Sequence, residues 1–511
     1  MNLAEHLDRA ALLHGPRPAL RDGATLLDHR ALADRSVRAS VVLSGAGVGV
    51  GDRVALVLPH TADFAIWYFA VLRLGAVAVA LDPAAPETVQ HRQIRQVDAA
   101  LVVAWAPAPT LALPGHPVLD ADRVDLASAS GDPDAPVPVG QVGPVGPVGP
   151  VPRDADDLAV LVYTSGTTAP PKPAALTHGN LVHDAHQVAV EVLELTQDDV
   201  LLGLLPFHGA FGQTCVLNAA LLAGASIALA PREEPARAVD VLVREGATVL
   251  LGVPSMMQAL LAAAGPDDLA AARVRVCLCG GAALPLGLLL DLERRLGCVV
   301  LEGYGLSEAA PVVAANRIDR RRLGSVGLPL DGVEVRVAPS ATDGTGPDAV
   351  GELLVSGRTV MAGYWGPHGV ETDTLADGWL HTGDLGHRDA DGFLHVLDRA
   401  TEVMWRGGHA VYPRAIEQVL YDHPGVREAA VVEVPVERAG GGEPDLVAFV
   451  VLEPGSAADP ARPGDLLRDL ARQLGRLPAH ARPARVEITA ALPKTRTGKI
   501  LKRALRTAVQ A

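Results

Sequence analysis

This chain is poor in cysteine, in aromatic residues and in basic charge. Its 511 residues include only 4 cysteines, which are too few and too scattered for a disulfide framework. Aromatic residues make up 3% of the chain, so small aliphatic side chains must fill its core. The formal net charge of −15 argues against nucleic-acid binding, which needs a positive field. The composition therefore favours a globular protein that binds no nucleic acid.

We expect neither a signal peptide at the start of this sequence nor a membrane span within it. Glu5 and Asp8 stand where a signal peptide would need basic and then purely apolar residues. No Asp, Glu, Lys or Arg occurs between Asp199 and Arg232, but glycines, Pro206 and polar residues interrupt this stretch repeatedly. We expect a buried strand, loop, helix and strand there, and no membrane span. A cytoplasmic location follows as an expectation.

A chain of this length exceeds one hydrophobic core and should divide into domains. Strand-like and helix-like segments alternate over residues 53–251, which predicts parallel sheets flanked by helices. Short β runs over 332–400 predict a small barrel-like β portion. We therefore predict an α/β fold, with a large N-terminal domain (1–398) and a smaller, mobile α+β C-terminal domain (399–511). Residues 136–153, rich in Pro, Gly and Val, should form a flexible surface loop.

The segment 161–178, LVYTSGTTAPPKPAALTH, combines an apolar strand with a loop rich in hydroxyls. Several backbone N–H groups and hydroxyls can turn toward one anion in such a loop, with Lys172 alongside. The loop lacks the G-x-x-x-x-G-K-[ST] spacing of the commoner nucleotide loop. The sequence predicts a phosphate site here, and a flexible polar turn is the alternative.

Four more segments follow in order: LEGYGLSEAAPVV at 301–313, HTGDLG at 381–386, LDRATEVMWRGGHAVYPRAIE at 397–417 and LPKTRTGKILKRALR at 492–506. Together with TSGTT, these segments resemble the adenylate-forming superfamily of acyl-CoA synthetases, firefly luciferase and peptide-synthetase adenylation domains. The resemblance spans roughly residues 20–506. LPFHGAFGQ and RGGHAVYPR look most like bacterial medium- and long-chain fatty-acyl-CoA ligases.

The resemblance implies an AMP-forming acid–thiol ligase that uses ATP, Mg²⁺ and coenzyme A. A carboxylate attacks the α-phosphate of ATP, which gives an acyl-adenylate and pyrophosphate. A thiol then displaces AMP. The first step joins two anions, so the site must supply positive charge and hold the reacting groups in line. We expect an apolar acid, medium-chain aliphatic or aryl.

The resemblance also implies which residues hold the nucleotide. Tyr304 would stack on adenine, Asp384 would accept hydrogen bonds from the ribose hydroxyls, and Arg399 would bond ribose or phosphate. A turn-capping role is the alternative for Asp384. The other implied nucleotide-binding residues are Thr164, Ser165, Gly166, Thr167, Thr168 and Lys172 at the phosphates, and Gly281, Ala282 and Ala283 beside adenine.

The implied catalytic residues lie on four of the segments. Lys499 would neutralise charge between the carboxylate and the α-phosphate, and Ser307 would bond that phosphate. Glu308 would bind Mg²⁺, for which one carboxylate suffices when phosphates and water complete the shell. His208 would stand at the entrance of the acyl pocket, or would simply be a core histidine. Gly408 would let the pantetheine arm of coenzyme A pass close to the backbone.

The same resemblance implies a hinge at DRATE, residues 398–402, about which the C-terminal domain rotates between the half-reactions. Two positions depart from the family pattern: Ala169 and Pro173 stand where it has glycines, so the loop should be stiffer and ATP handling weaker or slower. Three alternatives remain open. The acceptor could be a carrier-protein thiol or an amine, the acid could be unusual, such as nitrite, or the chain could be a degenerate adenylate-binding protein. A homodimer is possible.

Overall fold

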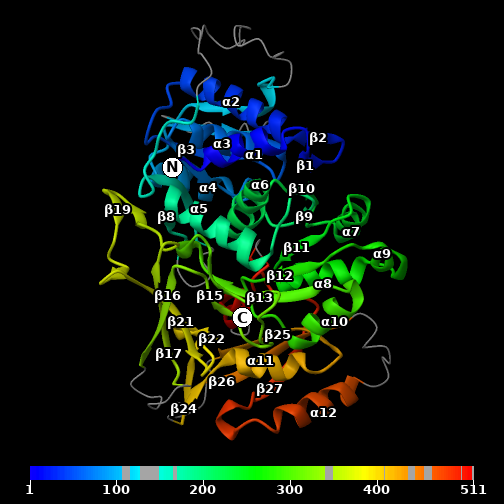
Figure 1. Cartoon of the computed structure of the whole chain (residues 1–511). Helices are drawn as coiled ribbons and strands as arrows, with labels where there is room; N and C mark the ends of the chain where they lie inside the picture. The colour runs from blue at the N-terminus through cyan, green and yellow to red at the C-terminus, as the bar shows by residue number, and fades with distance from the viewer. Residues whose placement is uncertain are drawn as a thin grey trace.

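The computed structural model describes residues 1–105, 116–126, 149–164, 170–339, 349–407, 409–434, 444–453, 463–495 and 498–508. These residues form two large, mostly parallel sheets, a smaller antiparallel sheet and a C-terminal lobe (Figure 1). None of the helices within the described residues is both long enough and apolar enough to span a bilayer. Of the low-complexity stretch 136–153, only residues 149–153 belong to the described part of the chain.

The first large sheet has nine strands in the order β15-β14-β13-β12-β11-β9-β10-β1-β2. Its central strands from β13 to β1 are parallel, and antiparallel pairs close both edges. Short, fully buried runs of Val, Leu and Ala suit a parallel sheet covered on both faces. The bounds are β15 Leu328–Pro329, β14 Val312–Ala315, β13 Val299–Gly305, β12 Val276–Cys279, β11 Val249–Gly252, β9 Val200–Gly203, β10 Ser226–Leu229, β1 Pro18–Asp22 and β2 Thr25–Asp28.

The second large sheet has eight strands in the order β19-β18-β8-β7-β4-β3-β5-β6. Strands β7 to β6 along this order are parallel, whereas β8, β18 and β19 pair antiparallel. Strand β18 is remote in sequence from β8 but pairs with it, so the side chains of β18 lie next to the predicted phosphate loop. The bounds are β19 Gly369–Glu371, β18 Gly363–Gly366, β8 Pro173–Thr177, β7 Leu158–Tyr163, β4 Val77–Ala80, β3 Arg53–Val57, β5 Leu101–Ala104 and β6 Val118–Asp120.

The main hydrophobic core lies between these two sheets. Every residue of helix α3 (Ala62–Arg73) except Asp63 is buried, as its apolar sequence ADFAIWYFAVLR requires. Other helices of this layer are α1 Ala4–His14, α2 His29–Gly45, α5 His178–Gln187 and α6 Ala219–Ala223, with π-helices η3 Val188–Val192 and η4 Phe211–Asn218. The outer faces are covered by α4 Glu87–Gln96 on the second sheet and by α7 Pro235–Arg244, α8 Pro254–Ala263, α9 Pro266–Ala271 and α10 Leu286–Leu296 on the first.

The charge-free segment between Asp199 and Arg232 forms strand β9, a loop, helices η4 and α6, and strand β10, as predicted. Cys277 and Cys279 lie on the same face of β12, buried in the core under the first sheet. Burial raises the pKa of both thiols, so they act as small apolar side chains.

The predicted barrel-like portion is a five-stranded antiparallel sheet. It begins at β16 and ends at β22, whose last residue is Arg399. This sheet carries the HTGD segment on its longest strand, β21. The bounds are β16 Val333–Pro339, β17 Gly351–Gly357, β20 Leu375–Ala376, β21 Trp379–Arg388 and β22 Leu394–Arg399.

The C-terminal lobe contains a hairpin and a three-stranded sheet with a small core on each face. The predicted fold class is thereby confirmed, and the domain boundary at 398/399 stays a prediction. The bounds are β23 Met404–Arg406, β24 His409–Val411, β25 Val426–Val434, β26 Asp445–Leu452, β27 Arg485–Ile488, α11 Pro413–Tyr421, α12 Pro463–Leu474 and α13 Lys502–Ala508, with 3₁₀ turns η2 Ala121–Arg123, η5 Ser307–Ala309, η6 Ala400–Glu402 and η7 Ala479–Ala481.

Candidate active site

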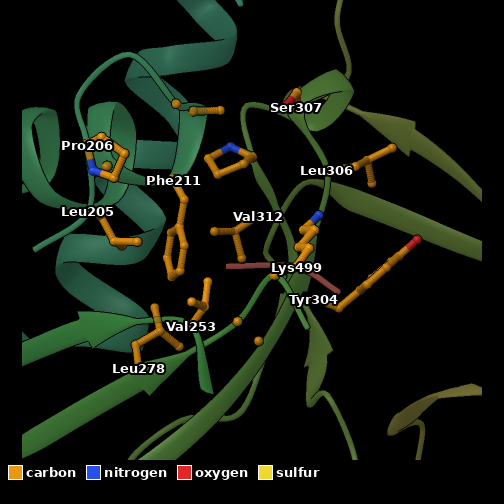
Figure 2. A pocket seen from close by; sticks show the side chains of 18 of the residues that line it. Leu205, Pro206, Phe211, Val253, Leu278, Tyr304, Leu306, Ser307, Val312 and Lys499 are labelled. Carbon is orange, nitrogen blue, oxygen red and sulfur yellow. The ribbon is translucent and has the colours of Figure 1, made fainter. Parts of the chain in front are cut away.

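A cavity of about 180 Å³ lies where the parallel strands β9, β11, β12 and β13 end (Figure 2). The carboxyl ends of such strands are where open α/β sheets bind ligands. Gly305 ends β13, and a side chain there would approach the carbonyl oxygen of Pro311 to 2.0 Å. Glycine thus lets the chain fold back on itself and bring residues 306–312 to the cavity.

The interior of the cavity is apolar. The ring of Phe211, the first residue of η4, stands between Leu205 and Val312 (Figure 2). Gly280 lies against this ring, since a Cβ there would be 3.6 Å from Cζ of Phe211 and 3.2 Å from the carbonyl oxygen of Gly303. The apolar side chains of the lining are Leu205, Pro206, Ala210, Phe211, Val253, Met256, Leu278, Leu306, Pro311 and Val312.

Polar groups reach the same cavity from three predicted site residues. His208, Ser307 and Lys499 all line it, although they come from distant parts of the chain. In Figure 2 the side chain of Lys499 lies between Val312 and Tyr304, with its amino group toward the side that carries Ser307. An apolar compartment thus ends in a hydroxyl, an imidazole and a lysine, the arrangement expected for an acid whose carboxylate faces the mouth.

Tyr304, Asp384 and Arg399 meet next to this mouth. The Tyr304 hydroxyl donates to Oδ2 of Asp384 at 2.7 Å, and Nε of Arg399 lies 2.9 Å from Oδ1. Asp384 is only 5% exposed, and the partners keep its carboxylate satisfied. Each oxygen of this carboxylate thus has a described partner, and a carboxylate oxygen can accept more than one hydrogen bond. Burial raises the pKa of Tyr304, and the neighbouring Asp384 carboxylate adds to the rise.

Lys499 is partly buried and lies close to the same charged groups. A Cβ on Gly281 would be 3.8 Å from Cε of Lys499, so this lysine reaches the loop after β12. Desolvation lowers the pKa of Lys499, and the nearby Arg399 guanidinium lowers it further. Asp384 and Glu308 oppose this shift by favouring the ammonium form. The lysine therefore stands within the field of both predicted nucleotide-binding carboxylates.

Glu308 and Lys172 are linked through a residue that the sequence did not single out. The hydroxyl of Tyr364, on β18, donates to Oε1 of Glu308 at 2.6 Å. The amino nitrogen of Lys172 lies 5.0 Å from the centre of the Tyr364 ring, on its face. The predicted phosphate-loop lysine and the predicted metal-binding carboxylate therefore converge on one tyrosine.

Both ends of the phosphate loop are fixed by hydrogen bonds. Thr164 donates its backbone N–H to the carbonyl of Lys172 at 2.9 Å, and Lys172 donates its own to the Thr164 hydroxyl at 3.1 Å. Pro173 is the first residue of β8 and lies opposite Tyr163 of β7. These two residues form a pair without backbone hydrogen bonds between them, as the neighbouring bond from Thr164 to Lys172 shows. The N–H that proline lacks is therefore not needed for the pairing with β7. The predicted residues Ser165, Gly166, Thr167 and Thr168, with Ala169, lie outside the described residues, as does Gly408.

A larger cleft of about 1010 Å³ adjoins the cavity and separates the C-terminal lobe from the rest of the molecule. Gly281, Ala282 and Ala283 line one side of it, and Arg399, Lys499 and residues of α11 and α13 line the other. The predicted adenine-side segment thus faces the lobe that supplies Lys499. Gln258 of α8 bridges the two sides, donating to the Arg427 carbonyl and to Glu453, each at 3.1 Å.

The carboxylate of Glu308 suits a metal ion that needs few protein ligands. Within the described part of the chain, no group of three or more His, Cys, Asp or Glu side chains could hold a metal ion. Glu308 offers one carboxylate beside the loop expected to hold phosphates. Magnesium commonly uses one or two carboxylates and completes its shell with phosphate and water.

Sequence reasoning missed the apolar wall, Tyr364 and Asp184. Asp184, on α5, is fully buried and accepts the backbone N–H of the cavity residue Val312 at 3.2 Å. Burial raises the pKa of this carboxyl well above its usual value. The places of Tyr364 and Asp184 depend on contacts between segments that are remote in sequence. For the apolar wall, the sequence offered one clue: Phe211 lies three residues after the predicted pocket residue His208.

Comparisons with known proteins agree with this geometry. The family model of AMP-binding enzymes matches residues 7–365, and that of the AMP-binding enzyme C-terminal domain matches residues 415–499. The chain is 36% identical over 504 residues to a feruloyl-CoA synthase of Amycolatopsis sp, covering 97% of this chain and 96% of that protein. It is 30% identical over 515 residues to a long-chain-fatty-acid–CoA ligase of Bacillus subtilis (strain 168), covering 94% and 90%.

A solved structure shows the same architecture. The ATP-bound MatB from Rhodopseudomonas palustris superposes with a TM-score of 0.85 at 29% identity, covering 100% of this chain and 99% of that one. The predicted resemblance and the predicted AMP-forming acid–thiol ligase activity are confirmed by relatives that match nearly the whole chain. With both its large part and its C-terminal lobe matched, this chain belongs to the family of AMP-binding enzymes.

Proposed function

We propose that this protein activates an apolar carboxylic acid, aryl or medium-chain aliphatic, as its acyl-adenylate and transfers the acyl group to coenzyme A. One observation carries the proposal: Ser307 and Lys499 line the apolar cavity together with Tyr304, whose hydroxyl bonds Asp384, the partner of Arg399. The carboxylate of an acid in the cavity would then lie next to a nucleotide bound at Tyr304, Asp384 and Arg399. The cavity is compact compared with pockets for larger ligands, which favours a short or aromatic acid over an extended chain.

The roles of the residues in adenylation follow from their places. The acid carboxylate at the mouth attacks the α-phosphorus of ATP, a new C(O)–O–P bond forms, and the bond to the pyrophosphate oxygen breaks. Lys499 offsets the charge of carboxylate and phosphate, which otherwise repel each other. The Ser307 hydroxyl donates to an α-phosphate oxygen, and His208 bounds the acid on the other side of the mouth.

Nucleotide binding uses the groups that lie around that mouth. Asp384 takes the ribose hydroxyls, Tyr304 presents its ring to adenine, and Arg399 holds Asp384 in place. Gly281, Ala282 and Ala283 form the adenine-side wall of the adjoining cleft. Thr164 and Lys172 close the loop that carries Ser165, Gly166, Thr167 and Thr168, which are proposed phosphate ligands.

Glu308 is the residue that would hold Mg²⁺, and its single carboxylate fits a metal bound mainly by phosphate and water. The ion supplies positive charge to the triphosphate when bound. In this chain, Glu308 contributes the negative charge that draws the ion to that place, and Tyr364 fixes one of its two oxygens.

For the thiol step we propose rotation of the C-terminal domain, residues 399–511, about the hinge at 398–402. Asp398 accepts the backbone N–H of Arg414 at 2.9 Å and so ties the hinge to the start of α11. Rotation would remove Lys499 from the mouth and bring Gly408 toward it, which opens a path for the pantetheine thiol. A soluble cytoplasmic enzyme is the setting we propose. A carrier protein as acceptor and a homodimer are subsidiary possibilities.

ATP–pyrophosphate exchange over a panel of acids tests the proposal. The panel should include benzoate, ferulate, octanoate and palmitate, each at several concentrations. We expect exchange with aromatic or medium-chain acids and little with palmitate. Adding coenzyme A should then release AMP. No exchange with any acid would overturn the proposal and favour an adenylate-binding protein, whereas exchange without release of AMP by coenzyme A would indicate another acceptor.

A further inference from the structure

Tyr364 occupies a place between two predicted phosphate-site residues that lie far from it in sequence. It is the second residue of β18, which pairs with β8 in the register Tyr364–Ala174. Lys172 lies two residues before Ala174, so the strand pairing sets the tyrosine beside that lysine. Glu308 comes from a different sheet, from the turn η5 after β13.

Tyr364 contacts Glu308 through its hydroxyl and Lys172 through the face of its ring. Its hydroxyl donates to Oε1 of Glu308 at 2.6 Å. A second bond steadies the same turn, because Met361 donates its backbone N–H to the Glu308 carbonyl at 2.9 Å. The Lys172 ammonium stands over the ring at 5.0 Å, within cation–π range.

The neighbouring residue on the same strand faces the other way. Trp365 packs against the core under the second sheet, and the Arg53 guanidinium lies 5.5 Å from its ring centre. Successive side chains of a strand point to opposite faces. The contacts of Tyr364 with Glu308 and Lys172 therefore belong to one face of β18 alone.

We propose that Tyr364 is a positioning residue that presents Glu308 to the metal of the metal–nucleotide complex and holds Lys172 at the phosphates. The inference rests on the proposed function. The hydroxyl occupies one carboxylate oxygen and leaves the other for the ion. The ring keeps the lysine over a surface that attracts its charge without neutralising it. Groups that orient a metal ligand commonly change metal affinity by about 10- to 100-fold when they are removed.

Metal titration of the full chain with ATP and without acid gives a test independent of turnover. Mn²⁺ binding, followed by electron paramagnetic resonance, should weaken by about tenfold in Tyr364→Phe. ATP binding without metal, followed by calorimetry, should be unchanged in this variant because the ring under Lys172 remains. Tyr364→Leu removes the ring as well and should also weaken metal-free ATP binding by about two- to fivefold.

Trp365→Phe is the matched control, since it trims an aromatic residue on the opposite face of the same strand and should bind both ligands as the wild type does. A thermal unfolding midpoint close to wild type checks that Tyr364→Phe is folded. Unchanged or tighter Mn²⁺ binding in Tyr364→Phe would overturn the inference. Failure of the wild-type protein to bind Mn²⁺ and ATP would instead count against the proposed function, so the two failures are distinguishable.

Discussion

At the scale of single residues, the site depends on charges held out of water. Lys499 has a lowered pKa because of desolvation and the nearby Arg399, while Asp384 and Glu308 oppose the shift. Only the ammonium form can offset the charge of two reacting anions. Burial strengthens the electrostatic effect of the Lys499 ammonium, but it also lowers the pKa, so the ammonium loses its proton at a lower pH than an exposed lysine does.

This balance predicts the alkaline limb of adenylation. The rate of pyrophosphate exchange should fall as pH rises through the lowered pKa of Lys499, before an ordinary lysine would lose its proton. Lys499→Arg should be slower near neutral pH because the guanidinium has another shape, yet its rate should stay flat into alkaline pH. Exchange measured across pH in both proteins tests this. Parallel decline of the two profiles would assign the limb to another group.

Asp184 predicts a pH effect on stability instead of activity. Its pKa is raised by burial in the folded state, so between the unfolded and folded pKa values the folded chain binds the extra proton. The free energy of unfolding must therefore fall as pH rises through this range, by up to about 1.4 kcal/mol per pH unit. Asp184→Asn keeps an acceptor for the Val312 N–H and cannot titrate. Its thermal unfolding midpoint should exceed that of wild type at pH 8 and approach it at pH 5.

Asp184→Leu provides the contrast, because it leaves the buried Val312 N–H without an acceptor and should be destabilised at every pH. An Asn variant that is less stable than wild type at pH 8 as well as at pH 5 would show that the carboxyl is ionised and needed in that form.

Residues of this kind separate what the sequence could predict from what it could not. Tyr304, Asp384 and Lys499 stand in segments whose order resembles the family, and the structure brings all of them to one mouth. Tyr364 and Asp184 carry no such local pattern. Their roles arise from a strand pairing and a helix packing that join remote segments, and one sequence does not state these contacts.

At the scale of secondary-structure elements, the π-helix η4 contributes part of the wall of the apolar cavity. It begins at Phe211, whose ring lies across the cavity, directly after the loop that carries His208. π-Helical turns are frequent at functional sites because they reposition side chains within a helix. The alternation of strands and helices was readable from the sequence. The π turn was not, because its residues have the apolar pattern of an ordinary helix.

The position of this ring predicts chain-length selectivity. Phe211→Ala should extend the cavity toward Leu205 and Val253, which contribute to the same wall. The ratio of kcat/KM for decanoate to that for benzoate should rise by at least about tenfold, since each methylene that gains a partner surface adds a sizeable free energy. Exchange assays with both acids measure this ratio. An unchanged ratio with intact folding would show that the ring does not limit the compartment.

At the scale of the whole molecule, the cavity is lined by residues of the large N-terminal part and by Lys499 of the C-terminal lobe. Gly281 and Lys499 line both the apolar cavity and the cleft between the two parts. The order of the segments predicted two such parts, and their relative placement needed three-dimensional contacts. Gln258 makes one of these contacts, with the Arg427 carbonyl and Glu453.

The Gln258 bridge predicts that the half-reactions can be separated without touching the chemistry. Gln258→Ala should lower pyrophosphate exchange by about two- to tenfold, since it removes hydrogen bonds that hold this arrangement of the lobes. Thioester formation from supplied acyl-adenylate should be nearly unchanged, because that step is proposed to use a rotated lobe. Arg237→Ala, which removes an exposed ion pair with Glu234, is the control and should leave both rates intact.

The most direct measurement compares Lys499→Ala with wild type in the two half-reactions, assayed separately. ATP–pyrophosphate exchange should fall by at least about 10²-fold, the scale of one preorganised electrostatic contact. Thioester formation from supplied acyl-adenylate and coenzyme A should change by only a few-fold. Normal exchange in the variant would contradict the convergence of acid, nucleotide and C-terminal lysine on one mouth.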